Sequence, residues 1–244
     1  MALFSFHCQN YKCGALVGLD KHNRRLNQNY GNPDIDKERT HLNRIYVAPE
    51  KSLYADCKKR IYKEVIANGN RVRSDSNWIC ECIFSYPADF PIERLDEYNA
   101  LIIKYMNSRM HNNVVMAVAH RDEGGIHLHV DIILITEDNR LSSKTLITRD
   151  FITSIHDKLP IMLQHHGFEV ERGTSGKIAG LNSKEYKKKM EEEKKTLDKK
   201  LDNMVDEYNQ LVEHYNHLLS ETRALEQRNF QKAKEILAER ERIR

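Results

Sequence analysis

One stretch decides the fold of this chain: His120-Arg121-Asp122-Glu123-Gly124-Gly125-Ile126-His127-Leu128-His129. Apolar runs flank it at residues 114–119 and 130–135. Such runs are typical of buried β-strands, so the residues between them are expected to form the turn of an antiparallel pair. His127 and His129 then lie on one face of the second strand, because side chains two residues apart point the same way.

The three histidines predict a metal site. Imidazoles at positions i and i+2 of a strand are about 7 Å apart, close enough to bind one ion, and His120 can supply a third nitrogen. Three imidazoles with an open position are typical of a catalytic rather than a structural ion. An isolated His-x-His is more often an ordinary strand pair, but the third histidine and the nearby carboxylates favour a site. Asp131, on the same face, either orients a ligand imidazole or is solvated.

The pattern H-x-D-E-x-x-x-H-x-H resembles the metal motif of the MobV (Pre/Mob) plasmid relaxases, a branch of the HUH endonucleases. That family typically has Pro before the second histidine, where this chain has Ile126. A second stretch is similar to the family's H-N-x-R, N-x-D-I-D and R-x-H-L-N elements: His22-Asn23-Arg24-Arg25, Asn32-Pro33-Asp34-Ile35-Asp36 and Arg39-Thr40-His41-Leu42-Asn43. Weaker matches follow at residues 141–144 and 166–173, so the resemblance covers residues 1–175.

The resemblance implies a metal-dependent relaxase. Such an enzyme nicks one strand of plasmid DNA at an origin of transfer and forms a covalent 5′-phosphoryl intermediate. In relatives with the H-N-x-R motif the histidine is the nucleophile, which here is His22, and Tyr30 and Tyr46 compete with it. A neutral imidazole has a free lone pair near pH 7, whereas a phenol with a pKa of about 10 must first lose its proton. His22 is therefore the preferred nucleophile.

Other residues are expected to act on the phosphate with the metal. Arg25 would neutralise charge on the transition state, for which a guanidinium fork is well shaped. Glu123 would complete the coordination sphere or orient the nucleophile. The ion, bound by His120, His127 and His129, would polarise a non-bridging phosphate oxygen. We expect Mn²⁺ or Mg²⁺, because the substrate is a phosphate and a carboxylate is near, although all-His ligation also suits Zn, Ni, Cu or Fe.

Charge is distributed unevenly along the chain. Over 244 residues, 39 Lys and Arg and 36 Asp and Glu give a net charge of +3. Residues 1–73 hold 14 basic and 7 acidic residues, whereas residues 74–180 hold 10 and 15. A positive segment beside an acidic metal-binding half suits a DNA strand led toward a cation. The candidate phosphate contacts, each of which is equally compatible with a solvated surface charge, are Lys12, Lys21, Arg24, Arg39, Arg44, Arg71 and Arg73.

The rest of the pattern predicts an α+β domain, in which helices pack on an antiparallel sheet in a HUH relaxase-like fold. Further strands are expected at residues 2–9, 78–86 and 168–172, and helices from Pro91 to about His111 and from a Thr148 or Asp150 cap to a stop at Gly167. The five cysteines lack zinc-ribbon spacing and are expected to be free thiols. No apolar run nears the roughly 20 residues of a membrane span, so we expect a cytoplasmic protein.

From about Asn182 the sequence becomes a charged helix without Gly or Pro. Its apolar positions follow strict four-three spacing, which indicates a heptad seam: Leu197, Leu201, Met204, Tyr208, Leu211, Tyr215, Leu218, Thr222 and Leu225. We therefore expect a relaxase domain at residues 1–180 and a coiled-coil extension at residues 181–244 that self-associates. The alternative is a single amphipathic helix that folds back on the sheet.

Three functional classes remain open. The first is a relaxase that acts on single-stranded or supercoiled origin DNA. The second is a Tyr-using HUH replication initiator or transposase, which the chemistry of the covalent adduct would distinguish. The third is a non-catalytic DNA-binding protein with a structural metal, which would bind DNA without nicking it.

Overall fold

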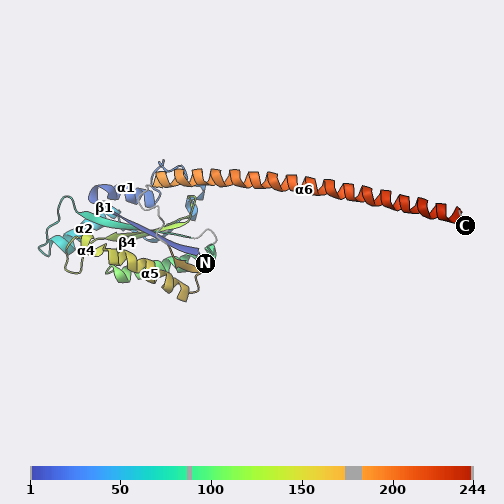
Figure 1. Cartoon of the computed structure of the whole chain (residues 1–244). Coiled ribbons are helices and arrows are strands. Elements are labelled where there is room, and N and C mark those ends of the chain that lie inside the picture. The colour runs from blue at the N-terminus through green and yellow to red at the C-terminus, as the bar shows by residue number, and fades with distance from the viewer. Residues whose placement is uncertain (1, 87–89, 174–182, 243–244) are drawn as a thin grey trace. The chain divides into compact units, whose positions relative to one another are not determined.

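The computed structural model describes residues 2–86, 90–173 and 183–242. It divides the chain into two compact units, Met1–Thr174 and Ser175–Arg244 (Figure 1). The domain boundary expected between residues 180 and 181 lies outside the described residues. The first unit is an α+β domain, as predicted, and the described part of the second is one helix.

A six-stranded sheet with the order β2-β4-β5-β3-β1-β6 forms the centre of the first unit. Its strands are β1 (Ala2–Lys12), β2 (Arg44–Val47), β3 (Asn77–Ser85), β4 (Val114–His120), β5 (His127–Ile133) and β6 (Val170–Arg172). Neighbouring strands are antiparallel except β1 and β6, which are parallel. The predicted antiparallel sheet is thus present, and one parallel pair, which was not predicted, lies at its β6 edge. A strand reached through a long connection, unlike one reached through a short turn, is free to pair in parallel.

Helices cover both faces of the sheet (Figure 1). On one face, α1 (Leu16–Asn23) and α2 (Leu53–Ile61) pack on apolar side chains such as Met116 and Ile133. On the other, α3 (Leu95–Arg109) and α5 (Arg149–His165) cover a larger core around Phe84. Because side chains alternate along β5, Leu128, Val130 and Ile132 face α3 and α5. The polar residues between them face the side of α1, as does Ile133.

The predicted helix ends agree with the observed caps. The Thr148 hydroxyl accepts a hydrogen bond from the Phe151 N–H at the start of α5, and Gly167 adopts a φ of 79° beyond its end, a conformation that favours glycine. The helix expected from Pro91 begins as a 3-10 turn, Ile92–Arg94, before α3. Short helical segments also occur at Cys13–Ala15, Lys37–Leu42, Tyr62–Ile66 and α4 (Ser143–Leu146). β2 was not predicted, because it is four residues long within a basic region.

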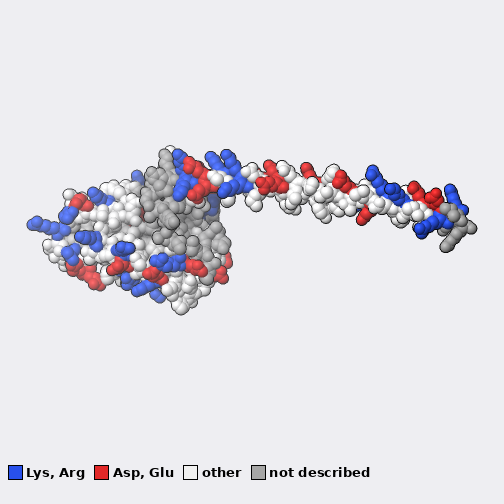
Figure 2. All heavy atoms as spheres, in the orientation of Figure 1, with Lys and Arg blue, Asp and Glu red and all other residues white. Residues whose placement is uncertain are grey.

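The described part of the second unit is the helix α6 (Ser183–Arg242). The apolar side chains of its heptad seam are exposed, from Leu197 at 67% to Leu225 at 57%. Lys and Arg lie toward the two ends of this helix, whereas residues 201–222 include acidic residues but no Lys or Arg (Figure 2). Among the described residues no helix has both the length and the apolar character required to cross a bilayer. All five cysteines are free thiols, as predicted.

Candidate metal and catalytic site

The register of β4 and β5 brings the three predicted metal ligands together. His120 lies opposite His127, and His129 lies two residues further along β5 on the same face. The ring centroids are 5.2 Å apart for His120 and His127, 4.5 Å for His120 and His129, and 4.8 Å for His127 and His129. His120 is fully buried and His129 nearly so. The three imidazoles thus occupy one small volume at the end of the strand pair.

Each of these histidines donates one ring N–H to an oxygen: His120 Nε2 to the Asn23 carbonyl at 2.8 Å, His127 Nδ1 to the Gly125 carbonyl at 2.9 Å, and His129 Nδ1 to Glu81 Oε1 at 2.7 Å. The opposite nitrogens of two rings, His120 Nδ1 and His129 Nε2, are buried and have no hydrogen-bond partner within residues 2–86, 90–173 and 183–242. An acceptor on one nitrogen fixes the tautomer and leaves the lone pair on the other, as in metal-binding histidines. This donor set fits a divalent cation.

The surroundings keep the imidazoles of two predicted ligands, His120 and His127, neutral. Burial, aided by the nearby His129 and Arg25, lowers the pKa of His120 to about 2. Burial also lowers the pKa of His127. A neutral imidazole is the form that binds metal, so no proton has to be displaced from these nitrogens at neutral pH.

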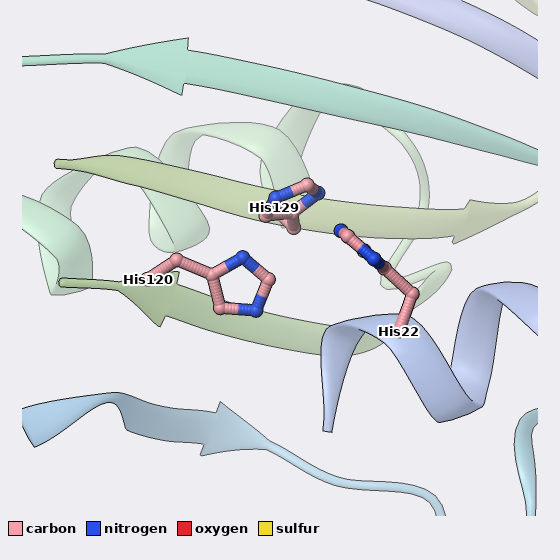
Figure 3. Close-up of side chains that lie close together, drawn as sticks. All are labelled: His22, His120 and His129. Carbon is pink, nitrogen blue, oxygen red and sulfur yellow. The ribbon is translucent and has the colours of Figure 1, made fainter. Parts of the chain in front are cut away.

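His22 points toward His120 and His129 from the last turn of α1 (Figure 3). Its ring centroid is 5.6 Å from that of His120 and 6.0 Å from that of His129. One ring nitrogen from each of the three residues lies within 4.8 Å of the other two. Burial lowers the pKa of His22, and the positive charge of Arg25 acts in the same direction. The imidazole is therefore neutral near pH 7 and has a lone pair to donate.

Glu123 lies beside ring nitrogens of two predicted metal ligands. Its Oε1 is 3.9 Å from His120 Nδ1, and its Oε2 is 4.0 Å from His127 Nε2. These three residues form a second group whose ligand atoms lie within 4.8 Å of one another. A carboxylate oxygen next to imidazoles broadens the site's preference toward harder cations such as Mn²⁺ and Mg²⁺.

Arg25 connects the end of α1 to the loop between β4 and β5. It donates from Nε and Nη2 to the two carboxylate oxygens of Asp122 and from Nη2 to Glu123 Oε1 at 2.6 Å. Its Nη1 donates to the His22 carbonyl at 3.0 Å and lies 3.4 Å from His22 Nε2. Its φ of 55° is rare for a residue other than glycine. The guanidinium therefore lies between the candidate nucleophile and Glu123.

The separated elements of the N-terminal motif contact this same loop. Their contacts are Asn32 Nδ2 to Glu123 Oε2 at 3.1 Å, the Asp36 N–H to the Asp122 carbonyl at 2.7 Å, Thr40 Oγ1 to Asp122 Oδ2 at 2.9 Å, and the Arg121 N–H to Asn43 Oδ1 at 2.7 Å. The spacing of these elements in the sequence thus corresponds to successive contacts with residues 121–123. Asp122, which received no role from the sequence, is the centre of these contacts.

Sequence reasoning also missed Glu81. It lies on β3 opposite Asp131 and accepts hydrogen bonds from His129, Asn23 and Tyr11. The orienting role considered for Asp131 thus falls to Glu81, while Asp131 accepts a hydrogen bond from Asn23 Nδ2 at 3.0 Å. The available signal was a single carboxylate within the otherwise apolar run of residues 78–84.

The two competing tyrosines lie in different places. Tyr46 packs with the core on the α3 side, where its hydroxyl donates to Asp96 at 2.6 Å. Burial and this hydrogen bond raise its pKa. The Tyr30 ring is 6.5 Å from that of His22 and 5.5 Å from the Arg25 guanidinium carbon. Of the two, only Tyr30 lies beside the site.

The seven predicted phosphate contacts differ in their availability. Arg24 makes two hydrogen bonds to Asp20, of 2.6 and 2.7 Å, and Arg73 binds Asp75 in the same way. The others are exposed and their side chains make no hydrogen bond or ion pair with described residues: Lys12, Lys21, Arg39, Arg44 and Arg71. These five exposed residues are the better candidates, because Arg24 and Arg73 would each have to give up a carboxylate partner to bind a phosphate.

A family model described as plasmid recombination enzyme (Mob_Pre) matches residues 1–188, and the chain belongs to this family. The plasmid recombination enzyme of Lactiplantibacillus plantarum is 33% identical over 190 residues, which are 74% of this chain and 52% of that protein. That of Bacillus thuringiensis is 27% identical over 188 residues, 76% of this chain and 42% of that protein. The chain thus spans about half the length of the curated relatives it matches.

A solved structure shares the fold. It is a Mn-bound crystal structure of the MobM relaxase domain (MOBV; Mob_Pre) bound to plasmid pMV158 oriT DNA, with a TM-score of 0.71 and 26% identity. The match covers 78% of this chain and all of that chain. A structure of the same domain with a 26-nucleotide oriT DNA has a TM-score of 0.59 and 25% identity. The family and fold expected from the sequence motifs are confirmed.

Proposed function

We propose that this chain is a metal-dependent relaxase that nicks one strand of plasmid DNA at an origin of transfer. Its place in the plasmid recombination family and the oriT DNA in the MobM structures support this class of substrate. The Mn²⁺ of those structures supports Mn²⁺ as the cofactor, to be held here by His120, His127 and His129 with Glu123 beside them.

One observation carries the proposal. Two buried imidazole nitrogens, His120 Nδ1 and His129 Nε2, have no hydrogen-bond partner among the described residues. The ring centroid of the neutral His22 lies 5.6 Å from that of His120 and 6.0 Å from that of His129. A buried polar atom without a partner costs about 1 to 3 kcal/mol, so two of them in one site require a compensating ligand. A cation would compensate both atoms and would polarise a phosphate oxygen next to His22.

The residues have distinct roles in the proposed reaction. A lone pair on a ring nitrogen of His22 attacks the scissile phosphorus, the P–N bond forms, and the P–O3′ bond breaks. The 3′-oxygen leaves as a hydroxyl, and the imidazole loses its ring proton, so the protons balance. Arg25 donates to the phosphoryl oxygens, on which negative charge develops in the transition state. The exposed basic residues hold the strand on either side.

Two alternatives are specific to this geometry. His22 forms a group with His120 and His129 whose ligand atoms lie within 4.8 Å of one another, as do those of His120, Glu123 and His127. This placement would suit a further metal ligand instead of a nucleophile. Tyr30, beside His22, is the second candidate nucleophile. A ligand role predicts weaker Mn²⁺ binding in His22→Ala, whereas a nucleophile role predicts unchanged Mn²⁺ binding and no nicking.

The test is incubation of supercoiled parent plasmid with the chain and Mn²⁺, followed by mapping of the nick. We expect His22→Ala to bind Mn²⁺ in a calorimetric titration but to leave the plasmid supercoiled, and Tyr30→Phe to nick. Tyr46→Phe, which changes a tyrosine on the opposite face, is the matched control and should also nick. Sequence-specific binding without any nick would instead favour a DNA-binding protein with a structural metal.

A further inference from the structure

Asn23 makes hydrogen bonds on two sides of the proposed site. Its side-chain Nδ2 donates to Glu81 Oε1 at 3.1 Å and to Asp131 Oδ2 at 3.0 Å. Its main-chain carbonyl accepts from His120 Nε2 at 2.8 Å. The side chain is fully buried. An amide NH₂ has two donors, and here both go to carboxylates on neighbouring strands.

These bonds connect Asn23 to two of the proposed ligands. It holds His120 directly through its carbonyl, and it holds His129 indirectly, because Glu81 accepts the His129 Nδ1 hydrogen bond at 2.7 Å. Asn23 also directly follows His22 at the end of α1. A shift of this one residue would therefore move the candidate nucleophile and both ligand imidazoles relative to one another.

We propose that Asn23 is a positioning residue that sets the placement of His22 relative to the metal. The inference rests on the proposed function. Misplacing a reacting group by about 1 Å costs on the order of a hundredfold in rate, and loss of an outer hydrogen bond to a ligand weakens metal binding by about 10- to 100-fold. A substitution of Asn23 should therefore change both the nicking rate and the metal affinity, whereas a substitution of an ordinary buried amide should change the stability alone.

The test compares Asn23→Leu with Asn99→Leu in the whole chain. Asn99 is an equally buried amide on the opposite face of the sheet, bonded to Tyr46 and Tyr86. Three quantities are measured: the melting temperature, the Mn²⁺ dissociation constant by calorimetry, and the single-turnover nicking rate at saturating Mn²⁺ and DNA. Both variants should melt earlier. Only Asn23→Leu should bind Mn²⁺ about tenfold more weakly and nick about a hundredfold more slowly.

Parental Mn²⁺ affinity and nicking rate in folded Asn23→Leu would overturn the inference while leaving the relaxase proposal intact. A parent chain that neither binds Mn²⁺ nor nicks would overturn the proposed function itself. If Asn23→Leu does not fold, Asn23→Ser carries the same test. Its single hydroxyl donor can reach only one of the two carboxylates, so the same losses are expected in milder form.

A separate observation concerns α6, where a third apolar column lies beside the heptad seam. Val205, Val212 and Leu219 recur every seven residues and are 50, 38 and 36% exposed. In a heptad lettered a to g, the seam occupies positions a and d. Val205, Val212 and Leu219 directly follow the d residues and are therefore e positions. The g positions directly precede the a residues, which are Leu201, Tyr208, Tyr215 and Thr222. In a parallel pair of helices e positions lie against g positions, whereas in an antiparallel pair e faces e and g faces g.

The charges at the g positions decide between these arrangements. In a parallel pair in register, Glu193 of one helix faces Asp198 of the other, and Glu221 faces Glu226, so that both contacts are repulsive. The apolar e residues of one helix then also lie against polar g residues of the other. An antiparallel pair that places Tyr208 of one helix beside Leu211 of the other brings g residues of the two helices into three favourable contacts. These contacts are Lys200 with Glu221, Glu193 with Arg228, and Glu207 with His214. We propose that α6 pairs antiparallel with α6 of a second copy of this chain.

The test is sedimentation equilibrium of the whole chain with charge-reversal variants. In the antiparallel pair, Glu221→Lys faces Lys200 of the other copy at two symmetric contacts, so the dimer should dissociate about tenfold more readily. Adding Lys200→Glu should restore the affinity. Glu213→Lys is the matched control, because Glu213 lies outside the seam and should have no effect. A tighter dimer with Glu221→Lys, or a chain that stays monomeric, would overturn the proposal.

Discussion

Arg25 and Asp122 are joined by two hydrogen bonds of 2.9 Å each, from Nε to Oδ2 and from Nη2 to Oδ1. Both side chains are buried, at 3% and 0% exposure. The pair ties the end of α1 to the β4–β5 loop and fixes the plane of the guanidinium. The remaining nitrogen, Nη1, is thereby directed toward His22.

The first prediction concerns this fork. Arg25→Lys keeps the charge but cannot reproduce two parallel bonds, so its ammonium is held less firmly beside the phosphate. We expect the single-turnover nicking rate to fall about a hundredfold, while the dissociation constant for an origin oligonucleotide changes far less. Arg109→Lys, on α3 of the opposite face, is the control. Equal losses of rate and affinity would show that Arg25 serves only to bind DNA.

A second prediction concerns stability and pH. Burial alone would raise the pKa of Asp122, but its hydrogen bonds from Arg25 and Thr40 lower it below the usual range. A carboxylate with a depressed folded pKa contributes stability above its unfolded pKa of about 3.9, and that contribution is lost as the pH falls toward the folded value.

Asp122→Ala should therefore destabilise the protein by about 3 kcal/mol at pH 7, and the difference from the parent should shrink below about pH 4. Urea unfolding at pH 7, 5 and 3.5 measures it. The exposed pair of Arg73 and Asp75 provides the control, because Asp75→Ala should cause no measurable loss. A difference that does not vary with pH would mean that Asp122 acts through packing alone.

The metal is the subject of the third prediction. His127→Ala should abolish nicking in Mn²⁺ while retaining most DNA affinity, which comes from cationic contacts elsewhere. Anisotropy with a labelled origin oligonucleotide measures the affinity, and the plasmid assay measures the nick. His111→Ala, at an exposed histidine paired with Glu137, should behave as the parent. Full nicking by His127→Ala would remove this residue from the proposed ligand set.

The fourth prediction concerns the two units. Removal of the residues after Gly180 should leave a folded domain that cuts an origin oligonucleotide, because all proposed site residues lie within the first unit. Circular dichroism and the oligonucleotide assay test this. Loss of the folded state on truncation would show that α6 packs on the sheet and is not a separate element.

The strand pair that carries the site was predictable because its apolar runs are long and its histidines alternate with apolar residues. The same alternation fixed the face on which His127 and His129 lie. The sequence does not specify which strand lies beside β5, and this neighbour supplies Glu81. Its role depends on the register of Glu81 with Asp131, a contact between residues far apart in the chain. A local pattern carries no information on such a pairing.

The motif around Asp122 was incomplete for a related reason. The resemblance marked Asn32, Thr40 and Asn43 without a reason for their spacing. The structure supplies one, since their side chains hydrogen-bond to successive residues of the 121–123 loop. The parallel pairing of β6 with β1 was missed because three residues carry too little periodicity to indicate a direction.

The central claim, that His22 is the nucleophile, is tested most directly by the stability of the covalent adduct. A bond from the imidazole to a 5′-phosphate is a phosphoramidate, whose nitrogen leaves as a neutral amine once protonated, so acid should release the DNA. A tyrosyl phosphodiester lacks that route. The measurement is acid treatment of the trapped adduct with labelled DNA. We predict a labile adduct that is absent from His22→Ala and present in Tyr30→Phe; an acid-stable adduct that disappears in Tyr30→Phe would contradict the assignment.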